Sequence, residues 1–159
     1  MGAKSEAMAK QFEAKAKDAL ATLERLSEAD WKKVTGAEKW SVGVTAHHLA
    51  GGLQAVSNIV KGIVAGHSPG NFTRAMLDEM NAKHAKDHAS CTKAETIELH
   101  KKGAATAAAT IRGLSDEQLA KSGTVFTGVP PMTAEQLITR ALINHIDEHI
   151  GSIRKTVGQ

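Results

Sequence analysis

The sequence places two histidines near its C-terminal end at the spacing of a metal clamp. His145 and His149 stand four residues apart in the segment His-Ile-Asp-Glu-His. On a helix, side chains four residues apart lie one turn above the other, so both imidazoles can reach a single point. At about 100° per residue they diverge by about 40°, and with Ala141, Leu142 and Ile153 beside them they face the core or a pocket in it. This geometry could hold a divalent ion if a third ligand comes from elsewhere in the chain.

His48 is the third ligand that we predict. It lies at the margin of the apolar stripe of a helix that opens at Ser41, whereas His47 points about 100° further toward solvent. Helix bundles build metal sites from side chains that project inward from facing helices, and three imidazoles with an open fourth position form a catalytic type of site. We therefore predict that His48, His145 and His149 bind a divalent metal ion. Two alternatives stay open: the three histidines could be packing residues with satisfied hydrogen bonds, and His47 could replace His48 as the ligand.

The same segment also spells a protease motif, which we reject. His145-x-x-Glu148-His149 matches the inverted motif of one class of zinc proteases, but those enzymes take a further carboxylate ligand from well downstream. Only residues 150–159 follow His149 in this sequence. The forward motif His-Glu-x-x-His fails because residue 146 is isoleucine. Glu148, about 60° from His145 around the helix, is the nearest residue for a general base or for orienting a ligand, although a surface ion pair with lysine is the simpler interpretation.

A second histidine pair, His84 and His88, has the same spacing of four residues. The charged residues around this pair favour a partly exposed connecting helix over a direct metal site. We expect the pair, with Asn81, to line the mouth of a pocket. Three other histidines are interpreted as surface residues: His47, His67 and His100.

Capping signals and helical periodicity predict the elements that must position these residues. Apolar residues recur at helical spacing over four segments, at about 5–26, 41–65, 92–114 and 133–153. Ser41 can cap the second segment, and capping boxes begin the last two at Thr92 and Thr133. A further helix, at about 71–88, lies in the connection between the halves. We predict an all-α protein: a four-helix up-down-down-up bundle, with this long helical connection between two helical hairpins, in a single domain spanning 1–159.

Two adjacent glycines interrupt the second predicted helix. Gly51 and Gly52 each weaken a helix by about 1 kcal/mol relative to alanine. We expect that the close approach of a neighbouring helix or of a ligand compensates for this cost.

The composition excludes several classes of function. Twenty Lys and Arg against 17 Asp and Glu give a net charge of +3, spread along the chain, and aromatic residues make up only 3%. We therefore expect no nucleic-acid partner. No apolar stretch approaches the roughly 18 residues of a membrane span, and the N-terminal segment does not have the pattern of a signal peptide, so we expect no membrane association and a cytoplasmic location. The single cysteine, Cys91, is interpreted as structural and fits a reducing compartment.

Short motifs along the chain resemble those of the DinB/YfiT-like superfamily of metalloenzymes. The matching residues, in order, are Trp40-Ser41-Val42, His48-Leu49, Asn81, Leu114-Ser115-Asp116-Glu117, and Thr133 through His149 to Ile153. Each motif is short, and it is their common order that is specific. The resemblance implies a four-helix bundle, often a homodimer, that holds zinc or nickel with three histidines. These ligands carry over onto His48, His145 and His149.

The resemblance also implies a class of chemistry. Some members of the superfamily are S-transferases that use bacillithiol or mycothiol, and others are mycothiol-dependent isomerases. We therefore expect a divalent-metal-dependent enzyme, a thiol-dependent S-transferase or a hydrolase, with a small-molecule substrate and with a low-molecular-weight thiol as a further cofactor. The ion would act as a Lewis acid that lowers the pKa of a bound water or of the thiol. The alternative is a non-catalytic metal-binding or structural helical module.

Overall fold

The computed structural model describes residues 2–159, and its long elements are all helices. They are α1 (Ala3–Glu24), α2 (Glu28–Lys32), α3 (Val42–Val64), α4 (Arg74–Asp87), α5 (Lys93–Arg112), α6 (Asp116–Ala120), α7 (Ala134–Leu137) and α8 (Asn144–Val157). A π-helical segment, η1 (Ile138–Ile143), joins α7 to α8. Two short strands, β1 (Ser122–Gly123) and β2 (Met132–Thr133), pair antiparallel at one end. None of the helices in residues 2–159 combines the length and apolar character that a membrane crossing requires.

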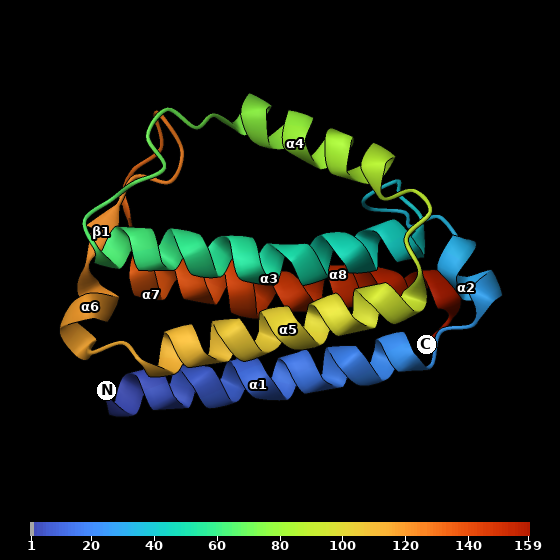
Figure 1. Ribbon diagram of the computed structural model, residues 1–159, viewed down its shortest axis with the longest axis horizontal. Coiled ribbons are helices and arrows are strands. Elements are labelled where there is room, and N and C mark those ends of the chain that lie inside the picture. The colour runs from blue at the N-terminus through green and yellow to red at the C-terminus, as the bar shows by residue number, and fades with distance from the viewer. Residues whose placement is uncertain (1) are drawn as a thin grey trace.

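Four long helical rods form a bundle with the predicted up-down-down-up order (Figure 1). α1 and the α7–η1–α8 rod run in one direction, and α3 and α5 run in the other. α3 packs against both α5 and α8, and α1 packs against the same two helices from the other side. α4 is the predicted helical connection, and it arches over α3 between the two hairpins. The all-α bundle that we predicted is therefore confirmed.

The bundle is held together by apolar side chains from all four rods. The fully buried ones include Phe12, Leu23, Leu49, Leu53, Ile111, Ile138, Leu142, Ile146 and Ile153. Each such side chain stabilises the fold by about 1.5–3 kcal/mol. This core fixes α3 and α8 relative to each other, and these two helices carry the three predicted metal ligands.

The predicted helix starts are confirmed by their caps. The Ser41 hydroxyl accepts a hydrogen bond from the Val44 backbone N–H at 3.0 Å and caps α3, which begins six residues before His48. Thr92 and Thr133 each form a complete capping box at the start of α5 and α7. The helix expected at about 71–88 begins later, at Arg74, because Thr73 caps it.

The last helix differs from the continuous α-helix that we expected. η1 lies between α7 and α8, and backbone hydrogen bonds in a π-helix reach one residue further than in an α-helix. The direction of the His145 side chain therefore cannot be calculated from those of Ala141 and Leu142 at about 100° per residue. His145 and His149 both lie beyond η1, in α8, so their own stacking by one helical turn is preserved. Periodicity alone did not indicate this segment, because its apolar residues suit both helix types.

The expected close approach of a helix to Gly51 and Gly52 is wrong. A Cβ added at either glycine would meet no atom within 4 Å. The tight helix contact occurs instead at Gly103 of α5, where a Cβ would lie 3.0 Å from the Ala50 carbonyl oxygen of α3. A second tight contact is at Gly43, where an added Cβ would lie 2.3 Å from Nε1 of Trp31. Gly51 and Gly52 thus leave open space on α3 one turn after the two histidines.

Candidate metal centre

The structure brings His48, His145 and His149 together between α3 and α8. One potential ligand atom from each lies within 4.8 Å of the others. The ring centroids are 5.1 Å apart for His48 and His149, 5.8 Å for His48 and His145, and 4.3 Å for His145 and His149. We call these three residues the primary triad. His48, rather than His47, is the histidine of α3 that joins the α8 pair.

The donor atoms of the primary triad suit a divalent ion. His145 Nε2 and His149 Nε2 are 2.9 Å apart. In a tetrahedral zinc site with Zn–N distances of about 2.0–2.1 Å, two ligand nitrogens lie about 3.3 Å apart. The two rings would need to separate by only a few tenths of an ångström. The pair on α8 therefore fits an ion, and His48 of α3 offers a third ligand atom within 4.8 Å of both.

Glu38 lies behind His149 and orients it. Its carboxylate accepts hydrogen bonds from His149 Nδ1 at 2.9 Å and from the Ser152 hydroxyl at 2.6 Å. Burial alone would raise the pKa of Glu38, but hydrogen bonds from Ser152, Thr35 and His149 outweigh it and lower the pKa. The ionised carboxylate holds the proton of His149 on Nδ1, which leaves the Nε2 lone pair directed at His145. Metal-binding histidines are commonly fixed by such an outer carboxylate.

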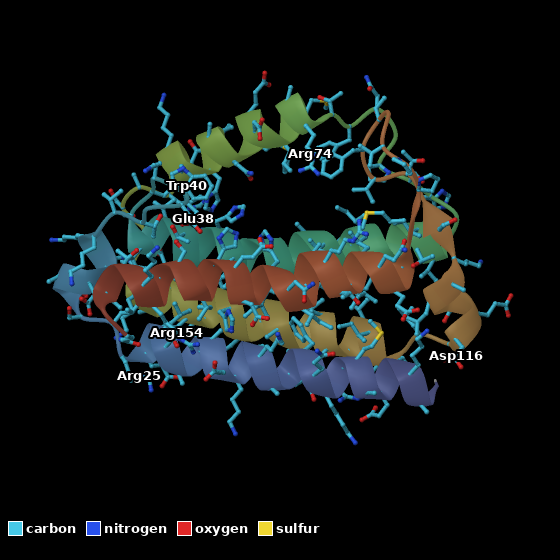
Figure 2. The ribbon with its side chains drawn as sticks, turned by 180° about the vertical axis from the view of Figure 1, so that it is seen from behind. Arg25, Glu38, Trp40, Arg74, Asp116 and Arg154 are labelled. Atoms are coloured by element: carbon cyan, nitrogen blue, oxygen red, sulfur yellow. The ribbon has the colours of Figure 1, made fainter. Side chains whose placement is uncertain are left out.

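Sequence reasoning missed Glu38, because its loop was interpreted only as a break between helices. The loop is closed by backbone bonding between Val34 and Ser41, and the Thr35 N–H donates to the Trp40 carbonyl at 2.8 Å. Figure 2 shows Glu38 and Trp40 between the bundle and the C-terminal end of α4. No local pattern pairs a loop glutamate with a histidine 111 residues later. Only the folded chain reveals the contact.

The imidazoles of His48 and His145 are kept in the neutral form that binds metals. Burial, followed by the nearby His149 and His145, lowers the pKa of His48 to about 3. Burial and then His149 lower the pKa of His145 to about 4. The Trp40 ring, just outside the start of α3, packs edge-on against His48 at 5.2 Å between centroids. At neutral pH an ion would therefore not compete with protons for the ring nitrogens of His48 and His145.

Glu148 and Asn81 lie apart from these contacts. The Glu148 side chain is exposed on α8, and no hydrogen bond or ion pair within residues 2–159 joins it to the primary triad. Asn81 is half-buried on α4. Glu38 is thus the carboxylate that contacts a histidine of the triad, while a role for Glu148 as a general base stays a prediction.

Two histidines predicted to be on the surface are not there. His100 is only 1% exposed, and its Nε2 lies 2.9 Å from the Ala16 carbonyl oxygen, because α1 covers this face of α5. His47 is half-buried under α4, where its Nδ1 lies 2.8 Å from His84 Nε2. The path of α4 over α3 could not be foreseen from periodicity, and it covers the face that had seemed free. His67 is exposed, as expected.

Comparison with known proteins places this chain in a family. The sequence profile of the mycothiol maleylpyruvate isomerase N-terminal domain matches residues 12–144. The chain belongs to this family. The mycothiol maleylpyruvate isomerase N-terminal family is part of the DinB-like superfamily, so the resemblance seen in the sequence is confirmed. The match includes Glu38 and His48 and ends one residue before His145.

Solved structures agree with this assignment at the level of the fold. The crystal structure of the mycothiol-dependent maleylpyruvate isomerase aligns with a TM-score of 0.72 at 15% identity, over 94% of this chain. A histidine-to-alanine mutant of that enzyme aligns with a TM-score of 0.74 at 14% identity, again over 94% of this chain. In both cases the alignment covers 60% of the other chain, so this chain spans less than two thirds of those enzymes. A comparison with curated proteins gives no match.

Proposed function

We propose that this chain is a divalent-metal-dependent enzyme that activates a low-molecular-weight thiol at His48, His145 and His149. The observation that carries the proposal is the convergence of three imidazoles from two helices, with Glu38 fixing the tautomer of one of them. A site kept for packing alone would not need three adjacent histidines, two of which, His48 and His145, have a lowered pKa in a half-buried position. The ion, zinc or nickel, would supply Lewis acidity that lowers the pKa of the thiol.

The thiol is proposed from the relatives. The family and its solved structures carry names that describe mycothiol-dependent isomerases. The open space at Gly51 and Gly52 supports an approach for a small molecule, because it lies on α3 one turn from His47 and His48 and has no protein atom within 4 Å of an added Cβ. Within this class, we propose thiol addition to an electrophilic small molecule, which serves both S-transfer and thiol-dependent isomerisation. Metal-dependent hydrolysis is the competing reaction.

Metal content tests the proposal most cheaply. Protein purified without an affinity tag should contain zinc or nickel, and His149→Ala should lose the metal of the primary triad while keeping its helical circular dichroism. His67→Ala is the matched control, because His67 is exposed and lies outside every histidine cluster of residues 2–159. If neither wild type nor the metal-reconstituted protein binds metal at the triad, the chain is a structural helical module and the proposal fails.

A thiol screen then separates the reaction classes. Metal-loaded protein should accelerate the consumption of an electrophile by mycothiol, bacillithiol or glutathione, and His149→Ala should not. Activity without any thiol, on ester or amide substrates, would replace the thiol branch with hydrolysis. No turnover of either kind would leave a metal-binding module without catalysis.

A further inference from the structure

A second cluster of three histidines lies beside the primary triad. His47 of α3, His84 of α4 and His88 at the C-terminal end of α4 each offer a ligand atom, and these atoms lie within 4.8 Å of one another. The ring centroids are 4.0 Å apart for His47 and His88, 5.0 Å for His47 and His84, and 4.6 Å for His84 and His88. We call these residues the α4 triad. We propose that the α4 triad is a second divalent-metal site, in which one ion links the C-terminal end of α4 to α3.

The nitrogen geometry of the α4 triad repeats that of the primary triad. His47 Nδ1 and His84 Nε2 are 2.8 Å apart, close to the 2.9 Å between His145 and His149. Both separations are within a few tenths of an ångström of the roughly 3.3 Å between ligand nitrogens around tetrahedral zinc. The spacing of His84 and His88 by four residues also matches that of His145 and His149. Each triad therefore combines one histidine of α3 with two histidines that lie four residues apart along another segment, α8 or the C-terminal end of α4.

One ring nitrogen of the α4 triad needs a partner that the chain does not supply. His84 Nδ1 is buried and has no hydrogen-bond partner among residues 2–159. Leaving a buried polar atom unpaired costs about 1–3 kcal/mol, so native structures seldom tolerate it. An ion bound through His84 Nε2 would fix the proton of this ring on Nδ1, so the unpaired atom would be a donor to an ordered water molecule.

Nearby carboxylates do not occupy the α4 triad. The Asp87 carboxylate is engaged by the Lys83 ammonium, and the Glu95 carboxylate accepts the Thr92 backbone N–H at 2.9 Å. The protein ligands are thus three imidazoles, with the remaining positions left to water. This donor set suits zinc, nickel and copper, and not calcium or magnesium, which prefer oxygen ligands.

The structure of α4 gives this second site a role. No residue of α4 is buried, although the helix is 14 residues long. Helices of this length are marginal in water unless tertiary contacts hold them. The chain around the N-terminal end of α4 is fastened by the stacked rings of Phe72 and Phe126, with Arg74 over the Phe126 ring at 4.6 Å. At the other end, the α4 triad is the contact with the bundle that a metal ion would strengthen.

The α4 triad also sets how α4 covers the primary triad. His84 lies between the two clusters: its ring is 5.0 Å from that of His47 and 5.7 Å from that of His48. An ion at the α4 triad would therefore hold α4 over the primary triad, and its loss would free that end of the cover. This inference does not require the chain to be an enzyme, because it concerns metal binding and the order of α4.

Metal stoichiometry tests the second site. Tag-free protein is stripped with a chelator, dialysed against a small excess of Zn²⁺, and analysed for zinc per chain. We expect two zinc ions in wild type and in His67→Ala, one in His88→Ala, one in His149→Ala, and none in the double variant. One ion in both wild type and His88→Ala, with none in His149→Ala, would overturn the second site and leave the proposed function intact. Loss of one ion in His88→Ala with no loss in His149→Ala would support the second site and refute metal binding at the primary triad.

Hydrogen exchange of α4 gives an independent readout. Zn²⁺ should slow amide exchange in the second half of α4 in wild type and in His149→Ala, but not in His88→Ala or in His84→Gln. Exchange in α1 and α5 should be equal in all of these variants, which verifies that they fold. If zinc still protects α4 from exchange in His88→Ala and His84→Gln, the metal link between α4 and α3 is refuted. It is also refuted if zinc gives no protection of α4 in wild type loaded with two ions.

Discussion

Replacing Glu38 is the perturbation for which the structure gives the clearest expected magnitude. Its side chain is 10% exposed, and it holds the Nδ1 proton of His149 at 2.9 Å while also accepting the Ser152 hydroxyl. Outer-shell partners of metal-binding histidines typically contribute 10–100-fold to metal affinity. Since each factor of ten corresponds to about 1.4 kcal/mol, Glu38→Ala should weaken zinc binding at the primary triad by about 1.4–2.7 kcal/mol. Glu38→Gln keeps an acceptor oxygen and loses only the charge, so its effect should be smaller.

The assay is a competition titration of Zn²⁺ against a chromophoric chelator, in the His88→Ala background so that the primary triad is measured alone. Glu148→Ala is the matched control: it removes a carboxylate from α8 that is exposed and does not contact the triad, and it should leave the zinc affinity unchanged. Ser152→Ala removes the other partner of Glu38, and should cost less than Glu38→Ala. If Glu38→Ala binds zinc as tightly as wild type, or if Glu148→Ala weakens binding as much, the assignment of the orienting carboxylate to Glu38 is wrong.

Three further predictions concern stability and assembly. Burial lowers the pKa of His100 below its usual 6.5. As the pH drops below 6.5, the imidazole of His100 is therefore protonated in the unfolded chain before it is protonated in the folded one. The free energy of unfolding then falls with pH, by at most about 1.4 kcal/mol per pH unit. In His100→Gln, whose amide can still donate to Ala16, urea unfolding at pH 7.5 and 5.5 should differ less than in wild type; an equal difference would contradict the burial of a neutral His100. Gly43→Ala should lower the free energy of unfolding by about 1–3 kcal/mol, because the added Cβ would collide with Trp31. Gly51→Ala meets open space on the same helix and should raise the free energy of unfolding by up to about 1 kcal/mol. Equal effects of the two substitutions would refute this packing. From the family resemblance we expect a homodimer, which sedimentation equilibrium would contradict by giving the mass of one chain.

The bundle could be predicted because its signals are local. Ser41, Thr92 and Thr133 mark helix starts through hydrogen bonds within three residues, and the structure has each of them. The primary triad followed from the same local geometry: a spacing of four residues on one helix and the inner margin of another. Its members are brought together as the sequence indicated, and their role as ligands is still to be measured.

Most of the features that the sequence did not indicate depend on contacts between distant segments. The π-helical turn of η1 has the same apolar residues as an α-helix would have, so periodicity could not distinguish them. His47 and His100 seemed to face solvent because α4 and α1 cover them from 37 and 84 residues away. Glu38 lies in a loop, whose direction no periodic pattern reports. For His47 and His100 the missing information was which remote element covers a given face.

Anomalous diffraction from crystals of the zinc-loaded, tag-free protein tests the central claim most directly. The account predicts a zinc peak about 2.0–2.1 Å from a ring nitrogen of each of His48, His145 and His149, with the Nε2 of His149 facing the ion and its Nδ1 on Glu38. A structure that binds zinc elsewhere and leaves these three nitrogens without a peak would contradict it.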